Sequence, residues 1–343
     1  MTKRNVLISL AILSFIAGIL IMSEYLNLFE EEAGFSYVQV LSKEAKRLHT
    51  KGISEENSSL NKNTSTENAS TTQREESRYG RVVHGTDHVI IYNSLPKCGS
   101  RTFGSASRML WKHRSIHMAK ISLRKHDNRY PNEREILEFM ESIEAPTFCQ
   151  GHGYFATSDH IQSPVHINFM RDPVSRMVSA FYYTRFGDNN RKRRAHPGHT
   201  TKKIMSIAEC LSSVGSRCIN TGIYPITFCG FNRRCQEDRA WALEQAKLNI
   251  NKYYTYIGIT EDYEASLRIF EHLLPDIYTG MTELYLSLLN QTNNQMARSK
   301  TRHKEPLTQD QLDVATKRFA VDNELYNYIY DRHRELKARY GIN

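Results

Sequence analysis

A strand, a turn of small residues and a helix follow one another between Val89 and about His113, and this order limits the folds open to the chain. The β-branched run that begins at Val89 is typical of a buried strand, which ends at Pro96. Apolar residues then recur at helical spacing from Phe103 to Trp111. N–H groups at a helix start attract anions, and the helix dipole adds to this attraction. The residues predicted to form this anion cradle are Lys97, Cys98, Gly99, Ser100, Arg101 and Thr102.

A second strand runs into a helix at Val165–Met170. Asp172 suits the cap of this helix, and Pro173 suits its first position. Arg171 at the end of the strand and Ser179 two turns into the helix are placed to bind another phosphate. Because parallel strands present their carboxyl ends at one edge of a sheet, the two turns together predict a ligand with two separate anionic groups.

Strands alternate with helices along the rest of the chain, which predicts a single α/β domain. We expect a central, mostly parallel sheet flanked by helices, with a P-loop-like turn after its first strand. A true Walker loop is absent, because no Gly-x-x-x-x-Gly-Lys run occurs. The remaining strands are expected at 116–121, 147–152 and 253–259, and the remaining helices at 132–143, 241–249, 263–274, 284–289, 307–319 and 324–339.

The N-terminal part of the chain divides into segments of different composition. Residues 6–22 form an uncharged apolar run long enough to cross a bilayer, with basic residues before it and acidic residues after it. A cleaved signal peptide is the alternative, but no small-x-small cleavage site follows the run. We therefore expect a cytoplasmic tail at 1–5, a transmembrane signal anchor at 6–22 and a type II orientation.

Residues 23–81 are expected to form a largely disordered lumenal stem, because their Ser, Thr, Asn, Glu and Lys residues bury little apolar surface. The catalytic domain is then expected at 82–343. Four Asn-x-Ser/Thr sequons are candidate glycosylation sites, which would agree with a lumenal location. These sequons begin at Asn57, Asn63, Asn68 and Asn290.

Four of the six cysteines lie close together, which suits an oxidising compartment and a disulfide-bonded loop region. They are Cys210, Cys218, Cys229 and Cys235. Zinc is disfavoured because no pair has Cys-x₂₋₄-Cys spacing, and three disulfide connectivities are open. We expect Cys98 and Cys149 to be free thiols.

Several stretches resemble known sulfotransferases. Pro-Lys-x-Gly-Ser-x-Thr at 96–102 resembles the 5′-phosphosulfate loop of that family, and Arg-Asp-Pro…Ser at 171–179 resembles its 3′-phosphate motif. Residues 185–188, 228–230 and 241–251 are similar to the 2-O-sulfotransferases that act on glycosaminoglycan uronic acids, in both the heparan sulfate and uronyl branches. The resemblance implies 3′-phosphoadenosine 5′-phosphosulfate (PAPS) as cofactor and a Golgi membrane location. It also implies sequential cysteine pairing and allows a homo-oligomer, a trimer.

Sulfuryl transfer to a sugar hydroxyl needs a base and a cation that stabilises the departing phosphate. His152 is predicted as the base, because it ends a strand at the same sheet edge as Lys97, and the resemblance also puts a family base there. Lys97 is predicted to stabilise the charge on the leaving oxygen. No metal is required, and His196 and His199 are not expected to bind one.

The chain carries a formal net charge of +9, and basic residues cluster after the 3′-phosphate helix. A glycosaminoglycan fits this charge better than nucleic acid, because an anchored and glycosylated chain would not meet nucleic acid. Arginine suits bidentate binding of sulfate and carboxylate groups. The residues predicted to bind the acceptor are Arg185, Arg191, Arg193 and Arg194.

The predicted function is therefore PAPS-dependent sulfuryl transfer to the 2-O position of uronic acids, with chondroitin or dermatan sulfate favoured and heparan sulfate second. One alternative is a glycosaminoglycan-binding protein that retains the fold without catalysis. Another is a nucleotide-dependent phosphotransferase, although the chain shows neither a Walker loop nor an obvious Mg²⁺ carboxylate pair near the turn.

Overall fold

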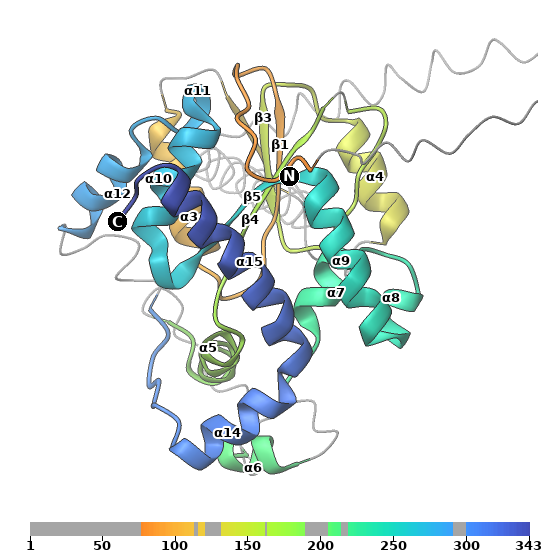
Figure 1. The fold of residues 1–343 in the computed structure, drawn as a ribbon, viewed down its shortest axis with the longest axis vertical. Coiled ribbons are helices and arrows are strands. Elements are labelled where there is room, and N and C mark those ends of the chain that lie inside the picture. Colours follow the sequence, from red (N-terminus) through yellow and green to blue (C-terminus); the bar gives the residue numbers. More distant parts are fainter. Residues whose placement is uncertain are drawn as a thin grey trace, which may run out of the picture. The chain divides into compact units, whose positions relative to one another are not determined.

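A five-stranded sheet forms the centre of the folded unit (Figure 1). The computed structural model describes residues 77–112, 116–120, 132–161, 163–188, 205–213, 219–290 and 300–343. The strand order is β2-β3-β1-β4-β5, and all four neighbouring pairs are parallel. The strands are β1 Val89–Asn93, β2 His117–Lys120, β3 Thr147–Gly151, β4 Val165–Met170 and β5 Tyr254–Ile259. The α/β fold class predicted from the sequence is confirmed.

The strand order places β1 and β4 side by side, although their connections leave in opposite directions. After β1 the chain passes to β2 at one edge of the sheet, and after β4 it passes to β5 at the other edge. Ligands of open α/β sheets bind in the crevice at the carboxyl ends of such a strand pair. The turns that follow β1 and β4 are the two anion-binding turns predicted from the sequence.

Helices cover both faces of the sheet, so β1 is buried on both sides. Ile90 and Tyr92 pack into the main core, whereas Val89 and Ile91 pack towards α4 on the opposite face. This arrangement explains the continuous apolar run of the strand. The helices are α3 Ser100–Leu110, α4 Glu133–Glu141, α5 Pro173–Phe186, α6 Ile207–Ser212, α7 Ile223–Cys229, α8 Arg234–Glu237, α9 Arg239–Tyr253, α10 Tyr263–Leu273, α11 Pro275–Tyr278, α12 Met281–Leu289, α14 Gln309–Arg318 and α15 Ala320–Arg339.

Aromatic side chains fix α3 against the sheet. The ring of Phe103 lies 5.0 Å from that of Phe169 on β4, 5.2 Å from Phe270 on α10 and 5.4 Å from Tyr278 on α11. Trp111 adds a hydrogen bond from its Nε1 to the carbonyl of Ile277, at 2.9 Å. The start of α3, and with it the first anion-binding turn, is therefore held by a rigid core.

The folded part begins before residue 82, at which the composition predicts the catalytic domain to start. The Tyr79 side chain is buried, and its hydroxyl donates to the carbonyl of Ile257 on β5 at 3.3 Å. The N–H of Gly80 donates to the carbonyl of Thr255 at 2.9 Å. One buried aromatic residue, Tyr79, followed by polar residues does not change the local composition enough to mark the start of a folded domain. Composition alone therefore places the start of the catalytic domain too late.

Several sequence-based predictions fall outside the residues that the structure describes. They concern the tail 1–5, the anchor 6–22, most of the stem, and the residues Asn57, Asn63, Asn68, Arg191, Arg193, Arg194 and Cys218. Across the described part of the chain, no helix is both long and apolar enough for a membrane span. Asn290, the remaining sequon, lies exposed at the end of α12.

The structure joins Cys229 to Cys235 in a disulfide that links α7 to α8. Cys210 is also engaged in a disulfide, and Cys218, its expected partner, lies outside the described residues. Cys98 and Cys149 are free and buried.

Candidate functional site

The turn between β1 and α3 is shaped to bind an anion. The backbone is left-handed at Lys97, with a φ of 71°, and at Gly99, with a φ of 79°. No backbone N–H from Lys97 to Thr102 donates a hydrogen bond to another group in the described parts of the chain, and α3 has no side-chain cap. Such a row of unpaired donors at a helix start is a cradle for phosphate or sulfate.

Gly99 is required at its position for two reasons. Its left-handed backbone favours glycine, and a Cβ atom there would lie 3.1 Å from the Tyr263 ring. The neighbouring Cys98 side chain points into the core, where its Sγ lies 3.8 Å from the Tyr224 hydroxyl. Burial raises the pKa of the Cys98 thiol to about 11, so this cysteine can serve the cradle through its backbone but not as a thiolate.

Lys97 lies at the open side of the cradle. Its Nζ sits 3.9 Å from the centre of the Tyr183 ring on α5, a cation–π contact. Burial, together with the nearby positive charges of Arg101 and Arg171, lowers the pKa of this lysine to about 8, against the opposing effect of Asp188. Like charges held together in this way favour the binding of an anion between them.

Arg101 is fixed by the Arg-Phe-Gly-Asp stretch at the end of α5. Its Nη2 donates to Oδ2 of Asp188 at 2.5 Å, and the Asp188 side chain is fully buried. Asp188 also forms an isolated antiparallel bridge with Thr301. No role was predicted for Asp188 from the sequence, whereas its carboxylate positions one side of the anion-binding turn.

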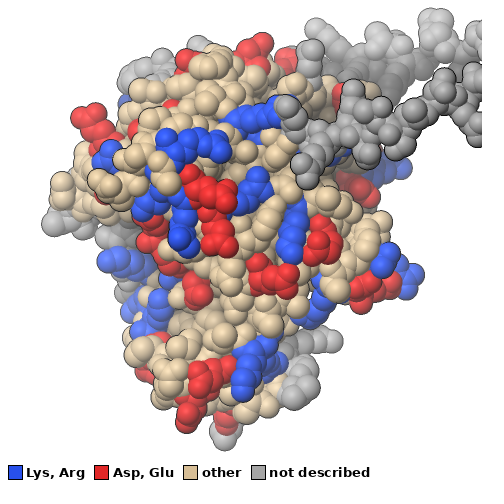
Figure 2. Space-filling model, in the orientation of Figure 1, with Lys and Arg blue, Asp and Glu red and all other residues tan. Residues whose placement is uncertain are grey.

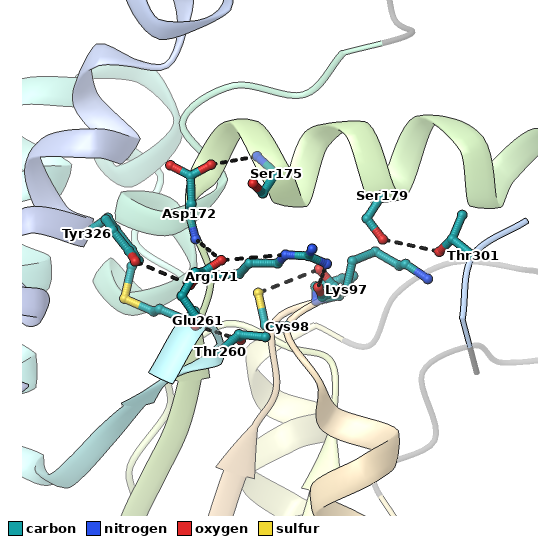
Figure 3. A network of polar contacts seen from close by, with 12 residues as sticks. Lys97, Cys98, Arg171, Asp172, Ser175, Ser179, Thr260, Glu261, Thr301 and Tyr326 are labelled. Carbon is teal, nitrogen blue, oxygen red and sulfur yellow. Dashed lines mark hydrogen bonds and ion pairs between the residues drawn. The ribbon is translucent and has the colours of Figure 1, made fainter. Parts of the chain in front are cut away.

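The turn after β4 meets the first turn directly (Figure 3). Nη1 of Arg171 donates to the carbonyl of Lys97 at 3.4 Å. Nε of Arg171 is buried without a hydrogen-bond partner among the described residues, although Oε1 of Glu261 lies 3.7 Å away. Ser179 is buried, and its hydroxyl lies 3.2 Å from that of Thr301. The structure therefore brings together Lys97, Arg171 and Ser179, as predicted from sequence spacing.

Three further residues at this turn carry no motif in the sequence. Glu261 accepts from the N–H of Asp172 at 3.1 Å and from the Tyr326 hydroxyl at 3.2 Å, and burial raises the pKa of its carboxyl (Figure 3). Partial burial and the nearby Arg171 lower the pKa of Lys304. Glu261, Lys304 and Thr301 reach the site only through folding, because they follow β5 or precede α14.

His152 lies directly after β3 at the same edge of the sheet, next to the end of β1. Its Nδ1 is 2.6 Å from the carbonyl oxygen of Ser94 and 3.1 Å from the Ser94 hydroxyl. A carbonyl can only accept, so Nδ1 carries the proton in the neutral ring and Nε2 is the basic nitrogen. The sequence does not show which polar group holds the His152 ring, and in the structure Ser94 does so.

The loop after His152 is held by the disulfide-bonded region. The N–H of Phe155 donates to the carbonyl of Thr227 on α7 at 2.7 Å, and the ring of Tyr154 lies 5.3 Å from that of Phe231. A Cβ atom at Gly230 would lie 3.0 Å from the Phe155 carbonyl. The Cys229–Cys235 disulfide thus braces the segment that carries the candidate base.

Arg185, predicted to bind the acceptor, contacts other residues of the protein through its guanidinium. Its guanidinium lies 3.4 Å from the centre of the Phe181 ring and donates to the carbonyls of Phe181, at 3.0 Å, and Met205, at 3.4 Å. These contacts tie the end of α5 to the segment before α6. No group of three or more potential metal ligands occurs in the described part of the chain.

The chain is similar in sequence to known proteins. The model of the sulfotransferase family matches residues 80–329. Human uronyl 2-sulfotransferase is 28% identical over 262 residues, which cover 74% of this chain and 64% of that protein. Heparan sulfate 2-O-sulfotransferase 1 of Gallus gallus is 30% identical over 264 residues, which cover 74% of this chain and 72% of that protein. The match thus spans less than two thirds of the uronyl enzyme.

Proposed function

Because this chain belongs to the sulfotransferase family, we propose that it transfers a sulfuryl group from PAPS to the 2-O position of uronic acid residues in a glycosaminoglycan. One observation carries the proposal. The unpaired N–H groups after β1, with Lys97 beside them, adjoin the Arg171 turn after β4 at the switch point of the sheet. PAPS supplies a sulfuryl group on a phosphate leaving group, together with a separate 3′-phosphate.

The residues present fit this cofactor. The N–H groups from Lys97 to Thr102, which have no partner among the described residues, suit the 5′-phosphosulfate end, and the Arg171 guanidinium suits the 3′-phosphate. Ser179, Thr301 and Lys304 would add a donor or a positive charge to the second group. A phosphate placed among these cations would relieve their mutual repulsion.

Each side chain has a defined task. Nε2 of His152 accepts the proton of the acceptor hydroxyl, while Ser94 holds the ring through Nδ1. Lys97 neutralises charge on the leaving oxygen, and Arg101 is kept in place by Asp188. The buried setting strengthens these charge interactions relative to water.

The acceptor is proposed from the relatives and from charge. Two relatives are named for uronyl or heparan sulfate sulfation. The face over α15 mixes acidic and basic side chains, so it lacks the single-sign surface that suits a polyanion (Figure 2). We assign acceptor contacts to Arg185, Arg191, Arg193 and Arg194, as predicted from the sequence, with chondroitin or dermatan sulfate favoured over heparan sulfate. A type II Golgi anchor at 6–22, a lumenal catalytic domain and a homotrimer belong to the same proposal.

Ligand-induced thermal stabilisation tests the proposed cofactor. Adenosine 3′,5′-bisphosphate at 100 times its Kd should stabilise the protein by about 2.7 kcal/mol. ATP with Mg²⁺ should stabilise it less, because ATP has no 3′-phosphate for Arg171. Stabilisation by ATP with Mg²⁺ alone would favour a phosphotransferase instead.

The lowered pKa of Lys97 predicts an alkaline limit on activity. Only the protonated lysine can neutralise a leaving phosphate, and its pKa is about 8 in the free protein. The kcat/KM for PAPS should therefore fall as pH rises above 8, by up to about tenfold per pH unit. Under saturating PAPS the fall in kcat should begin at higher pH, because a bound anion raises the lysine pKa. A kcat/KM that stays constant to pH 9.5 would contradict the role of Lys97.

Arg171 should matter mainly for the 3′-phosphate. The Arg171→Ala variant is expected to bind adenosine 3′,5′-bisphosphate about 10- to 100-fold more weakly, since a charge-assisted hydrogen bond contributes about 1.5–3 kcal/mol. Binding of adenosine 5′-phosphosulfate, which lacks the 3′-phosphate, should change much less. Calorimetric titration of both ligands measures the difference, and equal weakening would make the residue structural.

A further inference from the structure

Tyr224 lies buried between the two anion-binding turns, although no sequence motif marks it. Its hydroxyl donates to the main-chain carbonyl of Arg171 at 2.5 Å, and the Sγ of Cys98 lies 3.8 Å from the same oxygen. Cys98 belongs to the turn after β1, and Arg171 begins the turn after β4. One phenol group therefore contacts both turns.

The backbone of Tyr224 is anchored by a carboxylate from the far end of the sequence. Asp322, in the first turn of α15, is 1% exposed. Its two oxygens accept from the N–H of Gly222 at 2.5 Å and from that of Tyr224 at 3.0 Å. Helix α7 has no side-chain cap of its own, so Asp322 satisfies donors that its start would otherwise leave unpaired.

A buried cation, Arg176, lies near the buried Asp322 carboxylate. Arg176 on α5 is 4% exposed and lies 5.6 Å from the centre of the Tyr224 ring. Its Nη2 donates to the carbonyl of Asn220 at 3.4 Å. Burial raises the pKa of Asp322, whereas the two N–H donors and the guanidinium of Arg176 favour its ionised form. Residues of α5, α7 and α15 thus fix the tyrosine in one orientation.

We propose that Tyr224 is a positioning residue for the 3′-phosphate site, acting through the Arg171 main chain and held in place by Asp322. The Arg171 side chain starts at the α-carbon next to the bonded carbonyl, so a shift of this carbonyl moves the guanidinium away from the phosphate. The effect should be largest for ligands that contain a 3′-phosphate. This inference rests on the proposed function, because it assigns Arg171 to that phosphate.

The test compares two substitutions on the full-length protein. Tyr224→Phe removes the hydroxyl at Arg171, and Tyr256→Phe is the matched control. Tyr256 is equally buried, but its hydroxyl bonds Nδ1 of His333 at 2.7 Å. Calorimetric titration with adenosine 3′,5′-bisphosphate and with adenosine 5′-phosphate measures whether a loss of affinity depends on the 3′-phosphate.

Tyr224→Phe should weaken bisphosphate binding about three- to tenfold, the usual effect of one lost hydrogen bond, and should leave adenosine 5′-phosphate binding within twofold. Tyr256→Phe should leave both affinities within twofold. Asp322→Asn keeps the tyrosine hydroxyl but disturbs its anchor, and should reproduce the selective loss. A lower melting temperature for Tyr224→Phe with both affinities unchanged would overturn the inference.

Hydrogen exchange separates failure of this inference from failure of the proposed function. In Tyr224→Phe without ligand, the amides at the start of α5 should exchange faster than in the wild type and in Tyr256→Phe. Unchanged exchange and unchanged selectivity, in a wild-type protein that binds the bisphosphate, would overturn the positioning role alone. A wild-type protein that binds neither nucleotide would overturn both.

Discussion

Replacing His152 by alanine is expected to lower turnover by about 10²–10⁴-fold, the usual contribution of a general base. The structure gives the reason, because the Ser94 carbonyl fixes the proton on Nδ1 and leaves Nε2 as the nitrogen that accepts a proton. Binding of adenosine 3′,5′-bisphosphate should remain near the wild-type level, since the imidazole is assigned to the sugar hydroxyl. Turnover, bisphosphate affinity and melting temperature should be measured on one preparation.

His160→Ala provides the control for this substitution. His160 lies on the same loop, is 76% exposed and is 3.8 Å from Glu141, so its loss should leave turnover unchanged. An active but less stable His152→Ala protein would show that the residue only supports the loop.

Lys97→Ala is expected to reduce turnover by about 10²–10³-fold, as loss of one group that stabilises transition-state charge does in other enzymes. Affinity for the bisphosphate should fall less, because the unpaired N–H groups and the Arg171 turn remain. The comparison of kcat with the dissociation constant therefore separates stabilisation of the leaving phosphate from simple binding. Near-wild-type turnover in Lys97→Ala would remove this lysine from the mechanism.

Lys97→Arg is the matched variant, since it keeps the positive charge and the cation–π contact with Tyr183. It should retain more activity than Lys97→Ala. Its activity should also persist above pH 8, because an arginine stays protonated there. If the arginine variant lost activity at the same pH as the wild type, another group would cause the alkaline limit.

The sequence predicts those parts of the fold whose signals are local. The strand Val165–Met170 is found at the predicted residues because an apolar run, Asp172 and Pro173 mark its end and the next helix. The turn at Lys97 is equally local, since Pro96 and Gly99 shape it within a few residues. Parallel strand order then brings the two turns together without any further information.

Features that depend on residues far away in the sequence cannot be predicted from local sequence patterns. At the start of α7, Asp322 accepts the N–H groups of Gly222 and Tyr224 from about 100 residues away, and no nearby residue signals it. Glu261 and Thr301 join the site through β5 and through the bridge to Asp188. The internal contacts of Arg185 with the Phe181 ring and the Phe181 carbonyl also depend on the fold, and its predicted role in acceptor binding stays a prediction.

Transfer of radiolabelled sulfate from PAPS tests the central claim most directly. The purified protein would be incubated with desulfated chondroitin, dermatan and heparan sulfate, and the products digested and resolved as disaccharides. We predict label at the 2-O position of a uronic acid in at least one polymer, most strongly in chondroitin or dermatan sulfate, and none with Lys97→Ala above background. Label at other positions, or no transfer by a protein that binds the bisphosphate, would contradict the account.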